Sequence, residues 1–113
     1  MRPCNSMDEV RTEIDRLDRA IVPLLLERLD YIRQAGEIKR DRNTVRDAAR
    51  VEDVVAKVRA EATSAAKRLN HPEDPAALAD YVDEIYRFLI EWSINHEYGV
   101  WDRANRNHKD QER

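Results

Sequence analysis

The sequence predicts an all-α protein, and three observations support this fold class. The 113-residue chain is rich in Ala, Leu, Arg, Glu and Asp, a composition that suits helices. It contains only 2 glycines, which leaves little room for tight hairpins or phosphate-binding loops. Apolar residues recur at helical spacing, and no segment alternates in the manner of a strand. The length predicts one domain.

Charge and cysteine content exclude several classes of protein. Lys and Arg total 20 against 23 Asp and Glu, a net charge of −3 without the basic excess of a nucleic-acid binder. No apolar run approaches the roughly 18 residues of a membrane span, and residues 1–6 resemble no secretory signal. The single Cys4 offers no internal disulfide and no zinc-binding spacing. We expect a cytoplasmic protein that binds neither nucleic acid nor membrane.

The first helix is predicted from about residue 7 to about residue 40, after a flexible N-terminus over 1–6. Its apolar residues alternate at spacings of four and three, starting with Val10, Ile14, Leu17 and Ile21. About 33 residues span roughly 50 Å, too long for a core of its own in a chain this size. Pro23 lacks an N–H and predicts a kink, but the apolar pattern keeps its phase beyond it. We therefore predict a long kinked helix that pairs with a second copy in an intertwined homodimer.

Two further helices follow. Thr44 to Asp47 is a capping signal for a second helix over 48–69, and Asp74 and Pro75 suit the N-cap and first position of a third. The third helix is predicted to end near residue 104, so the helical domain spans 7–104 and 105–113 forms a polar tail. The predicted apolar faces are Val51, Val54, Val55, Val58 and Ala62 in the second helix, and Leu78, Val82, Ile85, Leu89, Trp92 and Val100 in the third.

Two cations of the first helix break its apolar pattern. Arg28 occupies a position where Leu or Ile is expected, and a buried cation is costly unless it is paired. Lys39 lies 11 residues later, about 20° around the helix and about 16 Å along it, so the two could bracket one small anion. The alternative for each is a solvated side chain, which for Lys39 also suits the helix C-terminus.

Arg11 lies 17 residues before Arg28, about 25 Å along the axis, so the two cannot share a small ligand within one helix. If two first helices cross in antiparallel fashion near residues 22–25, Arg11 of one chain falls between Arg28 and Lys39 of the other. A two-fold dimer would then have two equivalent sites, each completed by the partner chain. The alternative is an exposed N-terminal arginine.

Four more polar residues are candidates for the same site. Arg50 lies one turn into the second helix, and Asp47 before it is also a natural N-cap. Ser93 and Glu97 are four residues apart on one side of the third helix, where an inward carboxyl needs a partner or a proton. Four inward cations with few carboxylate partners indicate an anionic ligand, and a dicarboxylate fits because Arg binds carboxylates bidentately.

Taken together, the motifs resemble the all-helical class of chorismate mutases, a family with related isochorismate-pyruvate lyases. The resemblance covers about residues 7–103. It rests on the order and spacing of these segments: Ile14-Asp15-Arg16-Leu17-Asp18, Leu26-Glu27-Arg28, Ile38-Lys39, Val45-Arg46-Asp47-Ala48-Ala49-Arg50 and Leu89-Ile90-Glu91-Trp92-Ser93.

The resemblance implies a three-helix protomer, an intertwined dimer and the Claisen rearrangement of chorismate to prephenate, without metal or organic cofactor. It implies that Arg28 and the partner's Arg11 bind the substrate carboxylates, with help from Arg50, and that Lys39 donates to a carboxylate and to the ether oxygen. Asp47 would meet the ring hydroxyl. Ser93 would position a ring carboxylate.

Two departures from the family pattern keep alternatives open. Val51 stands where the family often has Glu, which resembles the lyase branch, as does the aromatic-rich stretch 92–101. Glu97 stands where the family often has Gln, and a carboxyl donates only when protonated, so we hypothesise that Glu97 acts in its protonated form. The alternatives to the mutase are an isochorismate-pyruvate lyase, a mutase of the 4-amino analogue, and a non-catalytic dimerisation module. Asp47 favours the mutase.

Overall fold

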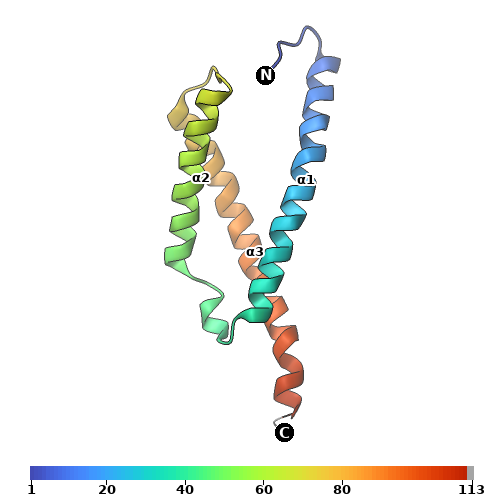
Figure 1. The fold of residues 1–113 in the computed structure, drawn as a ribbon, viewed down its shortest axis with the longest axis vertical. Coiled ribbons are helices and arrows are strands. Elements are labelled where there is room, and N and C mark those ends of the chain that lie inside the picture. Colours follow the sequence, from blue (N-terminus) through green and yellow to red (C-terminus); the bar gives the residue numbers. More distant parts are fainter. Residues whose placement is uncertain (112–113) are drawn as a thin grey trace.

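The protein is built from helices, as the sequence predicts (Figure 1). The computed structural model describes residues 1–111, with side chains described as far as residue 106. Over this range it has no strand, and its elements are three α-helices, α1 (Met7–Ile38), α2 (Ala48–Arg68) and α3 (Pro75–Gln111), with a short 3-10 helix, η1 (Arg42–Thr44), between α1 and α2. No helix within the described residues is long and apolar enough to cross a membrane.

Polar side chains set where each helix begins. The Ser6 hydroxyl accepts the Glu9 N–H at 3.2 Å, and the Asp47 carboxylate accepts the Arg50 N–H at 3.1 Å. Asp74 accepts the Ala77 N–H at 3.2 Å. Each cap satisfies a backbone donor that the first turn leaves without a partner. The predicted starts of α2 and α3 are thereby confirmed.

The turn after α2 is a Schellman motif. Asn70 adopts φ 51°, in the left-handed region that Asn tolerates better than most residues. The His71 N–H donates to the Ala66 carbonyl at 2.9 Å, and the Asn70 N–H donates to the Lys67 carbonyl at 3.1 Å. These bonds end α2 and direct the chain back along it into α3.

The third helix is longer than predicted. It continues to Gln111, so the expected tail over 105–113 is helical as far as it is described, and residues 112–113 lie outside the described range. The cause lies in the sequence, since no Pro or Gly follows Trp101. The Asn105 side chain also donates to the Trp101 carbonyl at 2.8 Å.

The first helix continues through Pro23 without interruption, in agreement with the predicted phase of its apolar residues. The kink expected at Pro23 stays a prediction.

The core lies where α3 meets α2 and the C-terminal half of α1. It is centred on Val45, Val55, Ile90 and Ile94. Gly36 is the buried residue of α1, because a Cβ there would lie 3.0 Å from Val100 Cγ1 and 3.1 Å from the Glu97 carbonyl oxygen. Glycine thus allows α1 and α3 to approach closely beside Glu97.

The N-terminal half of α1 diverges from the α2–α3 pair (Figure 1). Its apolar residues are left open, with Ile14, Leu17 and Ile21 exposed by 51%, 47% and 48%. The predicted apolar pattern is present, but within one protomer it covers no core.

The predicted apolar face of α3 needs correction. Ile85 and Trp92, expected to face the core, are about half exposed. Val100 is buried as predicted, and Ala79, Ile90 and Ile94 are buried without having been predicted. The reason is that α3 carries apolar residues on two faces, one against α2 and α1 and one outward. Periodicity alone cannot choose between them.

Candidate functional site

A pocket of about 610 Å³ opens between the C-terminal half of α1, the start of α2 and the middle of α3. This volume is typical of a small-molecule site. It is lined by Arg28, Ile32, Ala35, Lys39, Thr44, Val45, Asp47, Arg50, Val51, Val54, Ile90, Ser93, Ile94 and Glu97.

Six of the seven site residues predicted from the sequence line this pocket: Arg28, Lys39, Asp47, Arg50, Ser93 and Glu97. They come from three helices, so the fold gathers residues up to 69 positions apart. Arg11 is not among them, because it lies on the exposed N-terminal half of α1. The structure thus brings the predicted residues together, and their chemical roles stay predictions.

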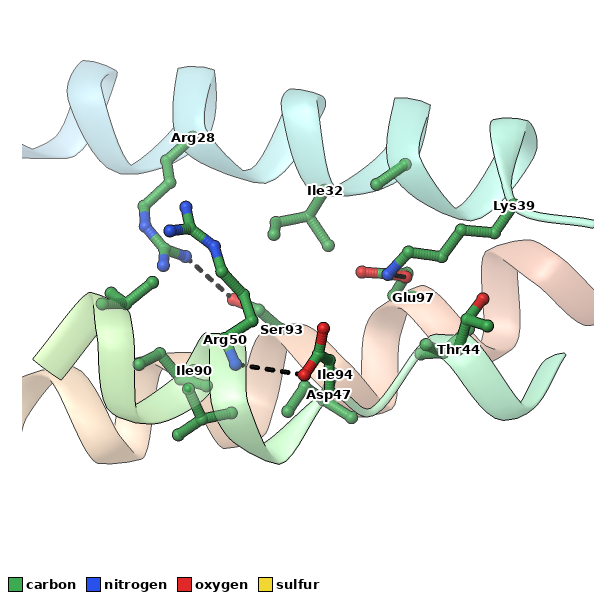
Figure 2. Close-up of a pocket in the computed structure, with 14 residues that line it drawn as sticks. Arg28, Ile32, Lys39, Thr44, Asp47, Arg50, Ile90, Ser93, Ile94 and Glu97 are labelled. Atoms are coloured by element: carbon green, nitrogen blue, oxygen red, sulfur yellow. Dashed lines mark hydrogen bonds and ion pairs between the residues drawn. The ribbon is translucent and has the colours of Figure 1, made fainter. Parts of the chain in front are cut away.

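The two cations of α1 lie at opposite ends of the pocket, with Ile32 between them (Figure 2). Both side chains point toward α3 from the same side of α1, as their separation of 11 residues predicts. The arrangement suits a ligand with anionic groups at its two ends.

Among the three cations that line the pocket, Arg28 is the one with no carboxylate partner within the described residues. Its Nη1 donates to the Ser93 hydroxyl at 3.4 Å, and its guanidinium lies 5.8 Å from the centre of the Tyr86 ring. Ser93 is buried and donates to the Leu89 carbonyl at 2.7 Å, which leaves its oxygen free to accept from Arg28. No ion pair to Arg28 is found among the described residues. A half-buried guanidinium in this state is prepared for an anion.

Glu97 and Lys39 form an ion pair at the other end. Lys39 Nζ lies 2.6 Å from Glu97 Oε2, and the two side chains are 30% and 5% exposed. The partner that an inward Glu97 requires is therefore Lys39. An anionic ligand would compete with Glu97 for this ammonium.

Asp47 and Arg50 form the third side of the pocket. One oxygen of Asp47 caps α2, which leaves the other free to face the pocket. The Arg50 side chain reaches from α2 toward Arg28 (Figure 2), although its Nη1 also donates to Asp53 at 2.7 Å. Asp53 accepts a second bond from Lys57 at 2.8 Å, and the Lys57 and Arg50 bonds lower the pKa of this carboxyl. Because Lys57 remains as a partner for Asp53, Arg50 can leave it for a ligand.

Several site residues escaped the sequence analysis. Tyr86 lies against the Arg28 guanidinium, and Asp53 accepts a hydrogen bond from Arg50. Asp53 is three positions after Arg50, so a search for partners three or four positions away would have found it. The apolar walls Ile90 and Ile94 lie beside Ser93 and Glu97 on α3. No sequence signal indicates Trp101, whose indole N–H donates to the Lys39 carbonyl at 3.0 Å.

Known proteins resemble this chain over most of its length. The model of the family "Chorismate mutase type II" matches residues 10–98, most of the chain and every residue that lines the pocket. The chain is also 26% identical, over 98 residues, to the isochorismate pyruvate lyase of Pseudomonas aeruginosa, a match that covers 87% of each chain.

Proposed function

Because the chain belongs to the chorismate mutase type II family, we propose that it is a chorismate mutase, which converts chorismate to prephenate at the pocket between α1, α2 and α3. The proposal rests above all on Arg28. A half-buried guanidinium whose polar partner is one hydroxyl, at 3.4 Å, requires an anion for its charge, and chorismate carries two carboxylates.

The pocket would act by binding chorismate in a compact conformer. Arg28 at one end and Lys39 at the other would each hold a carboxylate, with Arg50 assisting and Ser93 fixing the Arg28 guanidinium. The apolar walls of the pocket would hold the flexible side chain of chorismate over the ring of the same molecule. Holding two reacting ends in contact removes much of the entropic cost of an intramolecular rearrangement.

Lys39 would supply the electrostatic part of the catalysis. As the ether C–O bond breaks, negative charge develops on its oxygen, and a donor placed there stabilises the transition state more than the ground state. Lys39 would donate to this oxygen and to a carboxylate, after substrate displaces it from part of its contact with Glu97. One oxygen of Asp47 is not used in the helix cap, and it would accept a hydrogen bond from the ring hydroxyl of chorismate.

Glu97 would be the second donor to the ether oxygen. It can donate only in its protonated form, whereas the empty site holds it beside the Lys39 ammonium. Entry of a dianion would draw Lys39 toward itself and away from part of its contact with Glu97.

A second copy of the chain would complete each site. The exposed apolar face of the N-terminal half of α1 supports an intertwined homodimer, since a single protomer leaves Ile14, Leu17 and Ile21 open to water. In that dimer the partner subunit's Arg11 would enter the pocket between Arg28 and Lys39. Arg11 is exposed in the protomer and has no ion pair within the described residues.

One observation favours a second function, the cleavage of isochorismate to salicylate and pyruvate. Val51 lines the pocket where a mutase often carries a carboxylate, and the relative from Pseudomonas aeruginosa bears the name of this lyase. The same cations would serve this reaction, because its substrate has the same two carboxylates. Asp47 also lines the pocket, and it favours the mutase over the lyase.

The deciding experiment offers the purified protein chorismate and isochorismate in separate assays. Prephenate from chorismate supports the mutase, and salicylate with pyruvate from isochorismate supports the lyase. Turnover of neither substrate would indicate a non-catalytic helical module and would contradict the proposal.

A further inference from the structure

Two residues on one face of α3 contact Lys39, one at its side chain and the other at its backbone. Its ammonium meets Glu97, and its backbone carbonyl accepts the indole N–H of Trp101 at 3.0 Å, one helical turn further along. Lys39 is the C-cap of α1, with extended backbone, so its carbonyl is not used within the helix. The direction in which the Lys39 side chain leaves the backbone therefore depends on a residue outside the pocket.

Trp101 is itself well fixed. Its ring packs against the core cluster around Val45 and Ile94, and the Asn105 side chain donates to its carbonyl. Trp92, the other tryptophan, is half exposed and stacks on His96 at 5.3 Å between ring centroids. The chain thus offers one tryptophan bonded to the Lys39 segment and one that is not.

A second contact from the same part of α3 holds the segment after Lys39. Arg42 in η1 donates to Asp102 at 2.9 and 3.4 Å, and its guanidinium lies 4.5 Å from the centre of the Tyr98 ring. The hydrogen bonds that Arg42 donates to Asp102 raise the pKa of Arg42. Residues 39 and 42 are therefore both attached to α3 between Tyr98 and Asp102.

Trp101 and Asp102 lie beyond the part of the chain that the family model matches, which ends at residue 98. We propose that Trp101 is a positioning residue, which fixes the backbone of Lys39 so that its ammonium stays in the pocket, with Arg42–Asp102 as a supporting contact. This inference rests on the proposed function of Lys39. Its physical basis is preorganisation, because a donor held in place need not be reoriented during the reaction.

The test is Trp101→Phe, which keeps an aromatic ring in the core but removes the N–H donor. With whichever of chorismate and isochorismate is turned over, we expect kcat to fall about fivefold and KM to change less than about twofold, the size typical of one lost hydrogen bond. The control, Trp92→Phe, should leave kcat within about twofold of the original protein.

A double-mutant cycle separates positioning from general loosening. In a Lys39→Ala background, Trp101→Phe should lower kcat no further, since Trp101 acts through Lys39. An equal fall in both backgrounds, or no fall in the single variant, would overturn the proposal.

A measurement without substrate distinguishes this proposal from the proposed function. With two tryptophans, the two indole N–H signals in an NMR spectrum are assigned by the two Phe variants. The Trp101 signal should exchange with solvent more slowly than that of Trp92, and amides of residues 40–45 should exchange faster in Trp101→Phe. If neither substrate reacts, the proposed function fails. Unchanged exchange of these amides would still refute the positioning role by itself.

Discussion

Arg28 is the pocket side chain whose surroundings point most directly to an anionic ligand. Leu or Ile at this position would fit the apolar pattern of α1, so a guanidinium there costs desolvation that only an anion offsets. Its contact with Ser93 fixes its direction without neutralising it. Under the proposed function, the same residue that costs the isolated fold desolvation would give the pocket its affinity for carboxylates.

Replacing Arg28 with Met should lower kcat/KM by about 100-fold or more, because a charge-assisted bond to substrate is lost. Helicity and Tm should stay unchanged or rise, since an uncompensated charge has been removed. Kinetics and thermal melts followed by circular dichroism measure both. Arg33→Met is the matched control, because Arg33 pairs with Asp30 and Glu37 on the same helix. Full activity of the Arg28 variant would mean that the site is misplaced.

The role of Glu97 is tested by the pH dependence of the rate. If a protonated Glu97 donates to the ether oxygen, kcat should fall as pH rises through the range in which this proton is lost. Glu97→Gln donates at every pH, so its profile should be flat over that range. Glu84→Gln, on the exposed side of α3, should keep the original profile. The same slope in the Glu97 and Glu84 variants would exclude a protonated Glu97.

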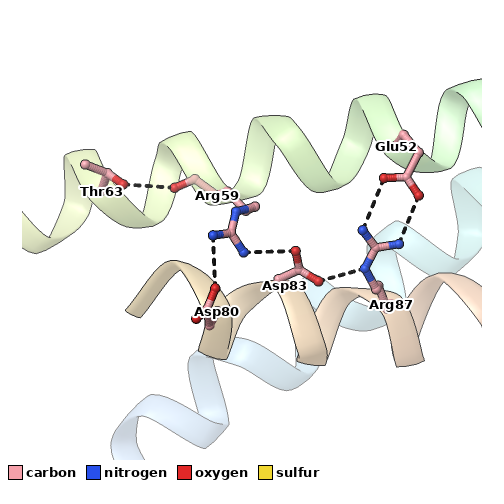
Figure 3. A network of polar contacts seen from close by, with 6 residues as sticks. All are labelled: Glu52, Arg59, Thr63, Asp80, Asp83 and Arg87. Atoms are coloured by element: carbon pink, nitrogen blue, oxygen red, sulfur yellow. Dashed lines mark hydrogen bonds and ion pairs between the residues drawn. The ribbon is translucent and has the colours of Figure 1, made fainter. Parts of the chain in front are cut away.

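At the scale of elements, α2 and α3 are joined outside the core by a network of ion pairs (Figure 3). Arg87 of α3 binds Glu52 of α2 through two bonds, at 3.0 and 3.1 Å, and binds Asp83 at 2.7 Å on its own helix. Arg59 of α2 reaches Asp80 and Asp83 at 3.0 Å. The network fixes the register of the two helices and thus the position of Arg50 opposite Ser93.

This network should make stability depend on pH. The Arg87 hydrogen bonds lower the pKa of Glu52 and of Asp83 in the folded protein. A carboxyl whose pKa is lowered by folding stabilises the folded protein at pH values above its ordinary pKa, near 4. This stabilisation is lost as the pH falls below that value. Arg87→Met should lower Tm at pH 7 and show a much smaller difference near pH 3. Thermal melts across this range test it. Arg16→Met, which breaks a pair within α1 alone, should change Tm less.

The whole molecule is more extended than a compact domain of its length. Its radius of gyration is 18.7 Å and its extents are 67 × 29 × 17 Å. A compact domain of this length would have a radius of gyration of about 13 Å. Much of the difference comes from α1, whose N-terminal half carries exposed apolar residues on no core of its own. A second copy related by a two-fold axis would cover the same face on both chains.

Two heterodimers test whether Arg11 acts across that interface. A dimer of an Arg11→Ala chain with an Arg28→Ala chain keeps one site with Arg28 and the partner's Arg11, so it should retain about half of the original activity. A dimer of the unmodified chain with an Arg11→Ala/Arg28→Ala chain should be inactive, because neither site has both residues. Differently tagged chains are co-expressed, and each heterodimer is purified through both tags before assay.

The opposite pattern would contradict the dimer model. If Arg11 serves its own chain, the first heterodimer is inactive and the second keeps half of the activity. Equal loss in both, or a monomer in size-exclusion chromatography with light scattering, would also refute the shared site.

Much of the fold and most of the site could be read from the sequence, because they depend on local chemistry. Backbone and helix geometry account for the caps at Asp47 and Asp74, for the placement of Arg28 and Lys39 on one side of α1 and for the apolar pattern of α1. Charges placed on apolar faces predict an anion site, which stays a prediction. The sequence by itself thus determined an all-helical chain with Arg28 and Lys39 on one side of its first helix, and its resemblance named the family.

What only the tertiary structure decided depends on contacts between distant residues. It showed which face of α3 is buried, since apolar residues surround much of that helix. It paired Glu97 with Lys39 and left Arg28 without a carboxylate, a distribution of partners that no spacing reveals. It also attached Trp101 to the Lys39 carbonyl, a contact across 62 residues. Periodicity fixes which residues share a face of one helix, but the choice of neighbour is made by packing in three dimensions.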